Sequence, residues 1–224
     1  MFKAVKSFFT LGIASGLAGL AGPPVLAGQG FEVTPFVGLY FPTAKVLSET
    51  ATSGSTTVTV GMKHNTQFLF GGRLTYWFNP RVGVEGAFGY TPSSVTISAS
   101  VSGLGSASVD SSAHVLLGSA RVLYKVGPKS GDTEIHLLAG VSFVSRGGAA
   151  YSIFDSTSGT QLSGLSDVGG VIGASVRFHA GRSLRIRVDI EDNLYSTQFE
   201  LAGSKTQSQF QNDIALSLGL AIPM

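Results

Sequence analysis

The sequence contains no cysteine and few charged residues. Without cysteine, the 224-residue chain cannot form a disulfide scaffold, bind a metal through thiolates or use a cysteine nucleophile. Only 12% of the residues are charged, against about 25% in a typical globular protein. Beyond the N-terminal segment there is no run of about 20 apolar residues, the length that a membrane-spanning helix needs. The apolar residues must therefore be spread over many short segments.

The N-terminal segment has the pattern of a secretory signal peptide. Lys3 and Lys6 precede an apolar stretch from Phe8 to Leu20, and residues 25–27 read Val-Leu-Ala. Small or aliphatic residues at these last positions suit cleavage by signal peptidase. The alternative, an N-terminal membrane anchor, is disfavoured because the apolar stretch is short. The sequence therefore predicts a signal peptide at residues 1–27 and export of the chain.

Removal of this leader leaves one domain, residues 28–224, whose charges balance. The two leader lysines account for the whole positive excess, so 13 basic residues remain against 13 acidic ones. No basic patch is present to bind nucleic acid. We therefore expect no nucleic-acid partner.

The exported part repeats segments of about ten residues in which apolar and other side chains alternate. In the last of them, aliphatic residues occupy every second position from Ile214 to Ile222. Alternate side chains of a strand point to opposite faces, and a strand crossing a membrane needs about 9–11 residues. Eight such segments can be identified: 31–41, 66–78, 82–91, 114–126, 134–145, 167–179, 184–195 and 211–223.

The alternation allows two kinds of barrel. Residues 184–191 alternate aliphatic with charged side chains, which suits a soluble lipocalin-like barrel with an apolar interior as well as a membrane barrel. In the last segment, the second face is mostly alanine, glycine and serine, which suits the cramped interior of a small barrel better than a solvated surface. We therefore predict an all-β fold, an eight-stranded antiparallel up-and-down transmembrane β-barrel.

The connections and the aromatic residues support this fold. Short connections near 79–81, 127–133 and 180–183 alternate with long Ser/Thr/Gly-rich ones at 43–65, 92–113, 146–166 and 196–210. Short turns at one end and long loops at the other are typical of transmembrane barrels. Part of the second long connection (95–101 and 106–109) still alternates, which predicts a longer hairpin. Aromatic residues lie near both ends, as aromatic girdles do: Tyr76, Trp77, Phe78, Tyr124 and Phe178 near short turns; Phe41, Phe68, Phe70, Phe88, Tyr90 and Phe143 near long loops.

With these features the chain resembles the small outer-membrane barrels of the OmpA-like and OmpX-like kind. The resemblance rests on the eight-strand rhythm, the segment 76–80 (Tyr-Trp-Phe-Asn-Pro) followed by 83–85 (Gly-Val-Glu), and the C-terminal segment Ser217 to Met224. That segment is similar to the family's assembly signal but ends in Met after Pro223. The resemblance implies a monomer in the bacterial outer membrane, in contact with lipid and lipopolysaccharide and inserted by the barrel-assembly machinery through Ser217 to Met224.

The face expected to point into the barrel carries charges of both signs. Interior charges are costly unless they are paired, so one hypothesis is a salt-bridged plug and the other is a narrow gated ion path through the same charges. The expected interior charges are Glu32, Arg73, Glu85, Arg121, Lys125, Arg177, Arg185, Arg187, Asp189 and Glu191.

The sequence offers little that would support catalysis or a cofactor. It contains no G-x-S-x-G, H-E-x-x-H or His-x-Ser-Asn motif. We therefore expect that the chain is not an enzyme and binds no cofactor. His136, His179 and Glu134 lie near one predicted rim and could together ligate zinc, although two histidines on paired strands more often join a polar network. The working hypothesis is a non-enzymatic envelope protein that acts structurally or through its long loops. The alternatives are a narrow channel and a lipid-modifying enzyme.

Overall fold

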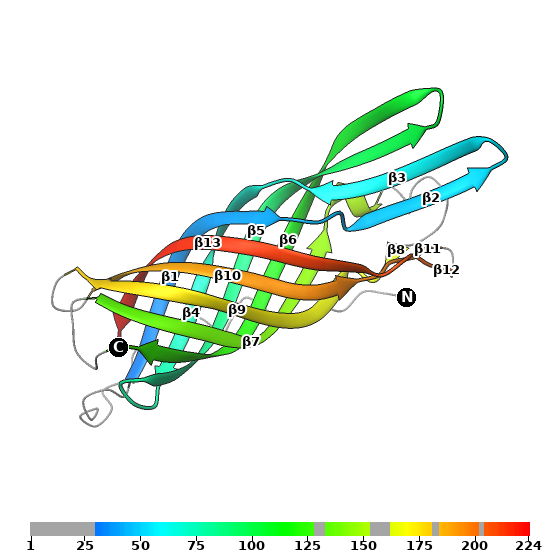
Figure 1. Ribbon diagram of the computed structural model, residues 1–224. Helices are drawn as coiled ribbons and strands as arrows, with labels where there is room; N and C mark the ends of the chain where they lie inside the picture. The colour runs from blue at the N-terminus through cyan, green and yellow to red at the C-terminus, as the bar shows by residue number, and fades with distance from the viewer. Residues whose placement is uncertain (1–29, 128–132, 153–161, 181–183, 202–203) are drawn as a thin grey trace, which may run out of the picture.

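The computed structural model describes residues 30–127, 133–152, 162–180, 184–201 and 204–224, and these form a closed antiparallel barrel (Figure 1). The predicted signal peptide lies outside the described residues. Eight strands pair in a ring, each with its neighbours, and the last strand closes on the first. The fold class predicted from the sequence is confirmed. The ring strands are β1 (Gly30–Pro42), β4 (Gln67–Trp77), β5 (Val82–Val101), β6 (Gly105–Val126), β7 (Thr133–Gly147), β9 (Ser166–His179), β10 (Arg185–Thr197) and β13 (Gln209–Pro223).

The connection between β4 and β5 is a tight turn at the end of the barrel where the chain terminates (Figure 1). The Asn79 side-chain oxygen accepts hydrogen bonds from the backbone N–H groups of Arg81 (2.8 Å) and Val82 (2.9 Å). Such a bond lets asparagine replace a backbone turn contact. The other two predicted short connections lie largely outside the described residues.

The aliphatic residues that alternate with charged ones along the ring strands face outward, and the charged residues expected inside face inward. Val37 is 62% exposed and Leu218 52% exposed, whereas Arg187 is fully buried. A soluble lipocalin-like barrel would have the opposite arrangement, so that alternative is wrong. None of the described helical residues forms a segment long and apolar enough to cross a membrane.

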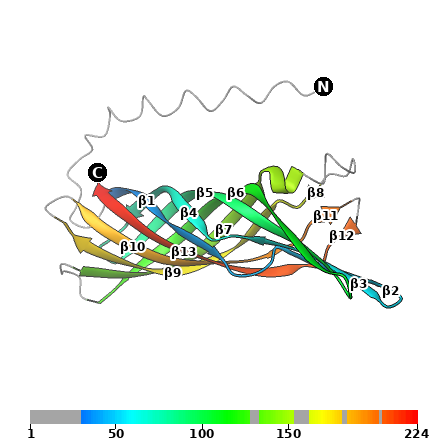
Figure 2. The same ribbon diagram turned by 90° about the horizontal axis from the view of Figure 1, so that it is seen from above.

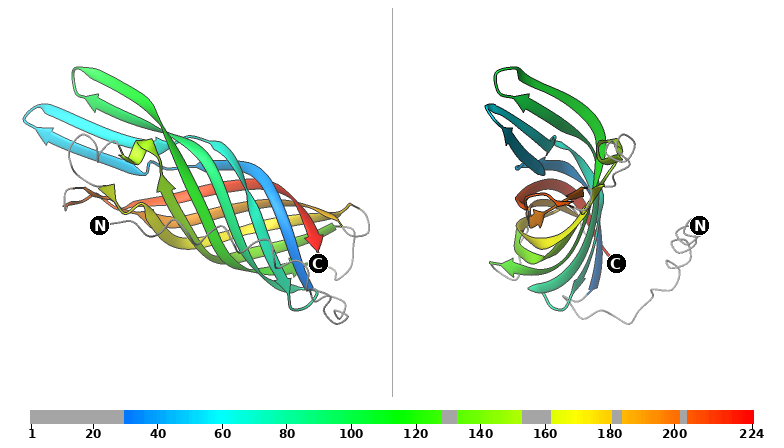
Figure 3. Two further views of the ribbon diagram at one scale, coloured as in Figure 1. Left: turned by 180° about the vertical axis from the view of Figure 1, so that it is seen from behind. Right: turned by 90° about the vertical axis from the view of Figure 1, so that its right-hand side faces the viewer.

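A four-stranded sheet projects beyond the long-loop end of the ring (Figures 1 and 3). It contains β2 (Leu47–Ser53), β3 (Thr56–His64) and the outer halves of β5 and β6, paired in the order β2-β3-β5-β6. We call it the projecting sheet. The extension of the second long connection into a longer hairpin is confirmed. The first long connection, predicted to be a loop, contains the β2–β3 hairpin. The sequence does not predict this hairpin because many small hydroxyl residues obscure the alternation of its strands.

The described parts of the other two long connections lie at the same end of the barrel (Figure 2). Residues 149–152 form one helical turn. Short strands β8 (Leu162–Ser163), β11 (Glu200–Leu201) and β12 (Ser204–Lys205) pair into a small separate sheet. Beneath these segments lies a cluster of buried apolar side chains that we call the apolar cap: Val46, Leu47, Met62, Val95, Ala113, Ala150, Tyr151 and Phe199.

Candidate functional site

The middle of the barrel interior holds six charged side chains from four strands. They are three arginines and three carboxylates, so their formal charges cancel. All lie among the charges expected inside from the sequence. This central charge cluster consists of Arg73 (β4), Glu85 (β5), Arg121 (β6), and Arg187, Asp189 and Glu191 (β10).

Glu85 is the most heavily bonded member of the central charge cluster. Its carboxylate accepts from Arg121 at 2.7 Å and 2.9 Å, and from Arg187 at 2.5 Å and 3.0 Å. The Thr75 hydroxyl also donates to it. Charge-assisted bonds of this kind are roughly twice as strong as neutral ones. One carboxylate of β5 therefore bonds to side chains of three other strands, β4, β6 and β10, across the interior.

Asp189 and Glu191 complete the cluster. Asp189 accepts from Arg187 at 2.7 Å and lies 3.4 Å from Arg73. Glu191 accepts from Arg73 at 2.8 Å and forms an ion pair with Arg121 at 2.7 Å. Each arginine thus contacts two or more carboxylates. Because every charge has an opposite charge within contact distance, the large cost of burying it is offset.

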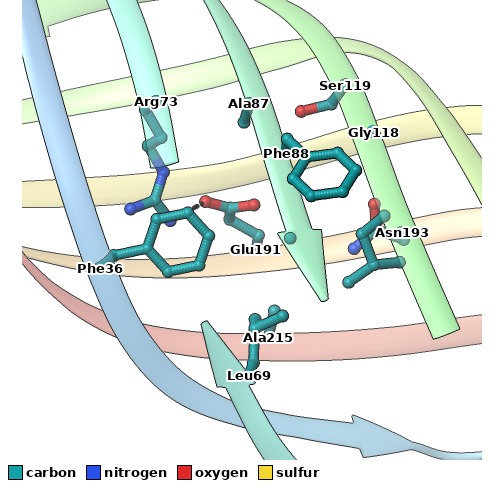
Figure 4. Close-up of a pocket in the computed structure, with 12 residues that line it drawn as sticks. Phe36, Leu69, Arg73, Ala87, Phe88, Gly118, Ser119, Glu191, Asn193 and Ala215 are labelled. Atoms are coloured by element: carbon teal, nitrogen blue, oxygen red, sulfur yellow. Dashed lines mark hydrogen bonds and ion pairs between the residues drawn. The ribbon is translucent and has the colours of Figure 1, made fainter. Parts of the chain in front are cut away.

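A small cavity lies beside the cluster, lined in part by Arg73, Glu191, Ser119 and Asn193 (Figure 4). Its volume is about 20 Å³, enough for roughly one water molecule. On its other side the guanidinium of Arg73 lies 3.9 Å from the centre of the Phe36 ring. Packed side chains thus leave little space next to the charges.

A second group of charges lies toward the short-turn end. Glu32 accepts from Arg177 at 3.0 Å and lies 3.5 Å from the partly exposed Arg185. Lys125 donates to Glu134 at 2.8 Å. All ten expected interior residues therefore face inward, in two groups, with Arg185 at the rim.

Trp77 also belongs to this interior group. The sequence predicts that Trp77 belongs to an aromatic girdle, but its ring packs beside buried Leu123, Leu138 and Val171. The Arg177 guanidinium lies 4.8 Å from the centre of this ring. The girdle assignment of Trp77 is wrong because the residue has the same strand parity as Arg73 and Thr75, which point inward.

The zinc hypothesis receives no support from the geometry. The His136 ring nitrogen lies 3.9 Å from a Glu134 oxygen, which is longer than a direct hydrogen bond, and His179 is exposed at the end of β9. Within the described parts of the chain, no three His, Cys, Asp or Glu side chains are grouped as metal ligands.

A third polar group, near the long-loop end, was not identified from the sequence. The hydroxyls of Tyr40 and Tyr195 both donate to the carboxylate of Asp213. Arg146 donates to Asp167 at 2.6 Å and its guanidinium lies 5.0 Å from the centre of the Tyr195 ring. Asp213 lies on the same face of β13 as the inward-facing Ser217, but its tyrosine partners lie at strand ends next to long loops.

Above this group, His64 joins the projecting sheet to the helical turn. One imidazole nitrogen lies 2.6 Å from the Tyr151 hydroxyl and the other 3.0 Å from the Ser93 hydroxyl. Burial, aided by the charge of Arg146, lowers the pKa of His64 to about 3, and burial raises the pKa of Tyr151. Within the described residues no carboxylate is bonded to His64, so the third group of a nucleophile triad is missing there.

Comparison with known proteins identifies the architecture. No protein-family model and no curated protein matches the sequence. Among solved structures, the chain is similar to the outer membrane protein OprG of Pseudomonas aeruginosa (TM-score 0.60, 14% identity, 88% of this chain and 97% of that one). It is similar to the outer membrane protein AlkL (0.57, 15%, 91% and 94%) and to outer membrane protein W of E. coli (0.51, 14%, 89% and 100%). At these identities the similarity establishes a small outer-membrane β-barrel fold.

Proposed function

We propose that the chain is a non-enzymatic integral protein of the bacterial outer membrane that acts through its extracellular part. The barrel serves as a closed anchor in the lipid, and the projecting sheet and apolar cap stand on the outside of the cell. In this orientation the short turns and the C-terminus are periplasmic. The outward aliphatic belt supports the lipid contact, because exposed apolar side chains of this extent are unfavourable in water.

The observation that carries this proposal is the filling of the barrel interior by paired, buried charges. The central charge cluster crosses the barrel from β4, β5 and β6 to β10, and the space beside it measures about 20 Å³. The interior of an eight-stranded barrel is just wide enough for side chains to fill. Paired arginines and carboxylates in that space form a plug rather than a pore.

Processing and assembly are part of the same proposal. Residues 1–27 serve as a cleaved signal peptide and residues 28–224 as the barrel domain. The segment Ser217 to Met224, the end of β13 that pairs with the start of β1, is the part recognised by the barrel-assembly machinery. The folded chain is a barrel monomer within the bilayer, surrounded by lipid and lipopolysaccharide.

Conductance across planar lipid bilayers tests the closed anchor against a narrow ion channel. The unaltered protein should show no conductance above that of the bare membrane. The matched variant is the double substitution Arg73→Ala with Glu191→Ala, which keeps the interior charge balanced while enlarging the cavity that both residues line. That variant should conduct. Stable unitary conductance by the unaltered protein would instead favour the gated ion path through the same charges.

A further inference from the structure

Within the residues that the structure describes, the projecting sheet ends in two free strand edges. On one side β2 pairs only with β3. On the other side β6 pairs with β7 only from His114 onward, so residues 105–113 have a partner on one side alone. A free edge presents a row of unpaired N–H and C=O groups and can pair with another strand.

Neither edge carries the features that usually prevent such pairing. Natural edge strands are often protected by lysine, proline or a bulge, and neither β2 nor residues 105–113 contains lysine or proline. Each edge has one acidic residue, and both of these carboxylates accept a hydrogen bond within the chain. Glu49 accepts from the Gln207 N–H at 2.8 Å, and Asp110 accepts from the Thr96 hydroxyl at 2.6 Å. On the β6 edge, Val109 is 60% exposed.

The two edges run in opposite directions. β2 leads away from the barrel, because Leu47 pairs with Met62 near the cap while Ser53 pairs with Thr56 at the tip. The outer half of β6 starts at its tip, Gly105, and leads back to the barrel. In two copies standing upright in one membrane, β2 of the first and β6 of the second would therefore be antiparallel. Two β6 edges in that arrangement would be parallel, the slightly less stable pairing.

The side chains of the two edges also match. On both strands, hydroxyl residues such as Thr50 and Ser108 occupy one face, and small apolar residues such as Ala51 and Val109 occupy the other. Because paired residues face the same side, a β2–β6 junction can continue both the hydroxyl face and the apolar face. A neighbouring strand would also cover Val109.

We propose that the partner of the projecting sheet is a second copy of this chain, joined by antiparallel pairing of its β2 with the outer β6. The junction repeats, since each copy offers one edge of each kind, and so it generates rows of barrels rather than closed dimers. This inference rests on the proposed function, in that it takes the projecting sheet to be extracellular.

Cross-linking of introduced cysteines tests the junction, because the chain has none of its own. Thr50→Cys and Ser108→Cys variants with different epitope tags are produced in the same cells, which are treated intact with a short bis-maleimide. Mixed dimers should exceed dimers of either variant alone several-fold. The matched control replaces Ser108→Cys with Ser98→Cys, on the same face of the central strand β5, and should give no mixed dimers. A scan locates the register: Thr50 and Thr52 against Ser106, Ser108 and Ser112.

A second variant keeps the test independent of cysteine geometry. Ser108→Lys places a charge at the β6 edge. In a chain that carries Ser112→Cys, produced together with the Thr50→Cys chain, it should abolish the mixed dimers. Ser98→Lys in the same background should leave them. Both variants must still migrate as folded barrels on unboiled gels. Equal or greater dimer formation by Ser108→Cys alone would overturn the proposal in favour of self-pairing edges.

Labelling of Thr50→Cys on intact cells by a membrane-impermeant maleimide separates the two levels of the argument. Absence of labelling in a folded barrel means that the projecting sheet is not extracellular, which overturns the proposed function. Labelling without mixed dimers at any scanned pair overturns the junction alone and leaves the proposed function in place.

Discussion

The two halves of β5 and β6 have opposite polarity. In the barrel half of β5, the outward positions include Val84 and Phe88 and the inward ones include Glu85. In the projecting half the outward positions are Thr96 and Ser98, and the apolar residues lie on the other face. The pairing of β5 with β6 runs through without a register shift. The same strand therefore exchanges its apolar and polar faces along its length.

This exchange shows that the surrounding solvent, and not the alternation itself, decides which face of the strand is apolar. Lipid favours apolar side chains outside and a polar interior, whereas water favours the reverse. The change occurs around Pro92 on β5, next to His114 on β6. We infer that the outer boundary of the hydrocarbon lies there.

The largest expected effect concerns the barrel half, where the charges are enclosed. Glu85→Gln leaves Arg121 and Arg187 without their main carboxylate. Removal of one member of a buried ion pair typically costs about 3–5 kcal/mol. Urea unfolding in lipid vesicles, followed by fluorescence of the single tryptophan, Trp77, measures the loss. Glu49→Gln, in the projecting half, should change the free energy of unfolding by less than about 0.5 kcal/mol. Equal effects would remove the contrast.

The same exchange of faces explains which parts of the fold could be predicted from the sequence. The eight ring strands could be located because lipid requires apolar side chains on the outward face of every strand that it surrounds. The ten interior charges could be identified because they lie on the opposite face, as Glu85 does. The β2–β3 hairpin was missed because its alternation, Val58, Val60 and Met62 against threonine, glycine and lysine, was not read as a strand in a loop rich in hydroxyls.

The third polar group, near the long-loop end, could not be predicted for a different reason. Arg146, Asp167 and Asp213 contact partners whose separation in sequence ranges from 18 to 173 residues. Alternation states which face a residue occupies but not how far along the barrel it lies. Its height depends on strand stagger, which the pairing of β7 with β9 and of β10 with β13 determines.

The next effect in size tests the exchange of faces directly. Val122 and Ser112 lie on the same face of β6, the first in the barrel half and the second in the projecting half. Val122→Lys should cost about 2–4 kcal/mol, since a lysine facing lipid near the bilayer centre is expensive. Ser112→Lys should stay within about 0.5 kcal/mol because that position faces water. Urea titration in vesicles compares them, and a comparable cost at Ser112 would place the hydrocarbon boundary further out.

The smallest effect depends on pH and concerns the contact between the projecting sheet and the cap. The pKa of His64 is lowered from 6.5 to about 3 in the folded protein, so the folded state stays neutral at acidities where the unfolded chain takes up a proton. Stability is therefore complete above about pH 6.5 and is lost progressively as the pH falls toward 3. At about pH 5, roughly 1.5 units below 6.5, the loss should be of the order of 2 kcal/mol. His64→Gln retains hydrogen-bonding groups toward Tyr151 and Ser93 but cannot titrate. Its stability should fall less on acidification than that of the unaltered protein in paired urea titrations, since carboxylates contribute equally to both. Identical pH profiles would show that the neutral imidazole of His64 does not stabilise the contact between the projecting sheet and the apolar cap.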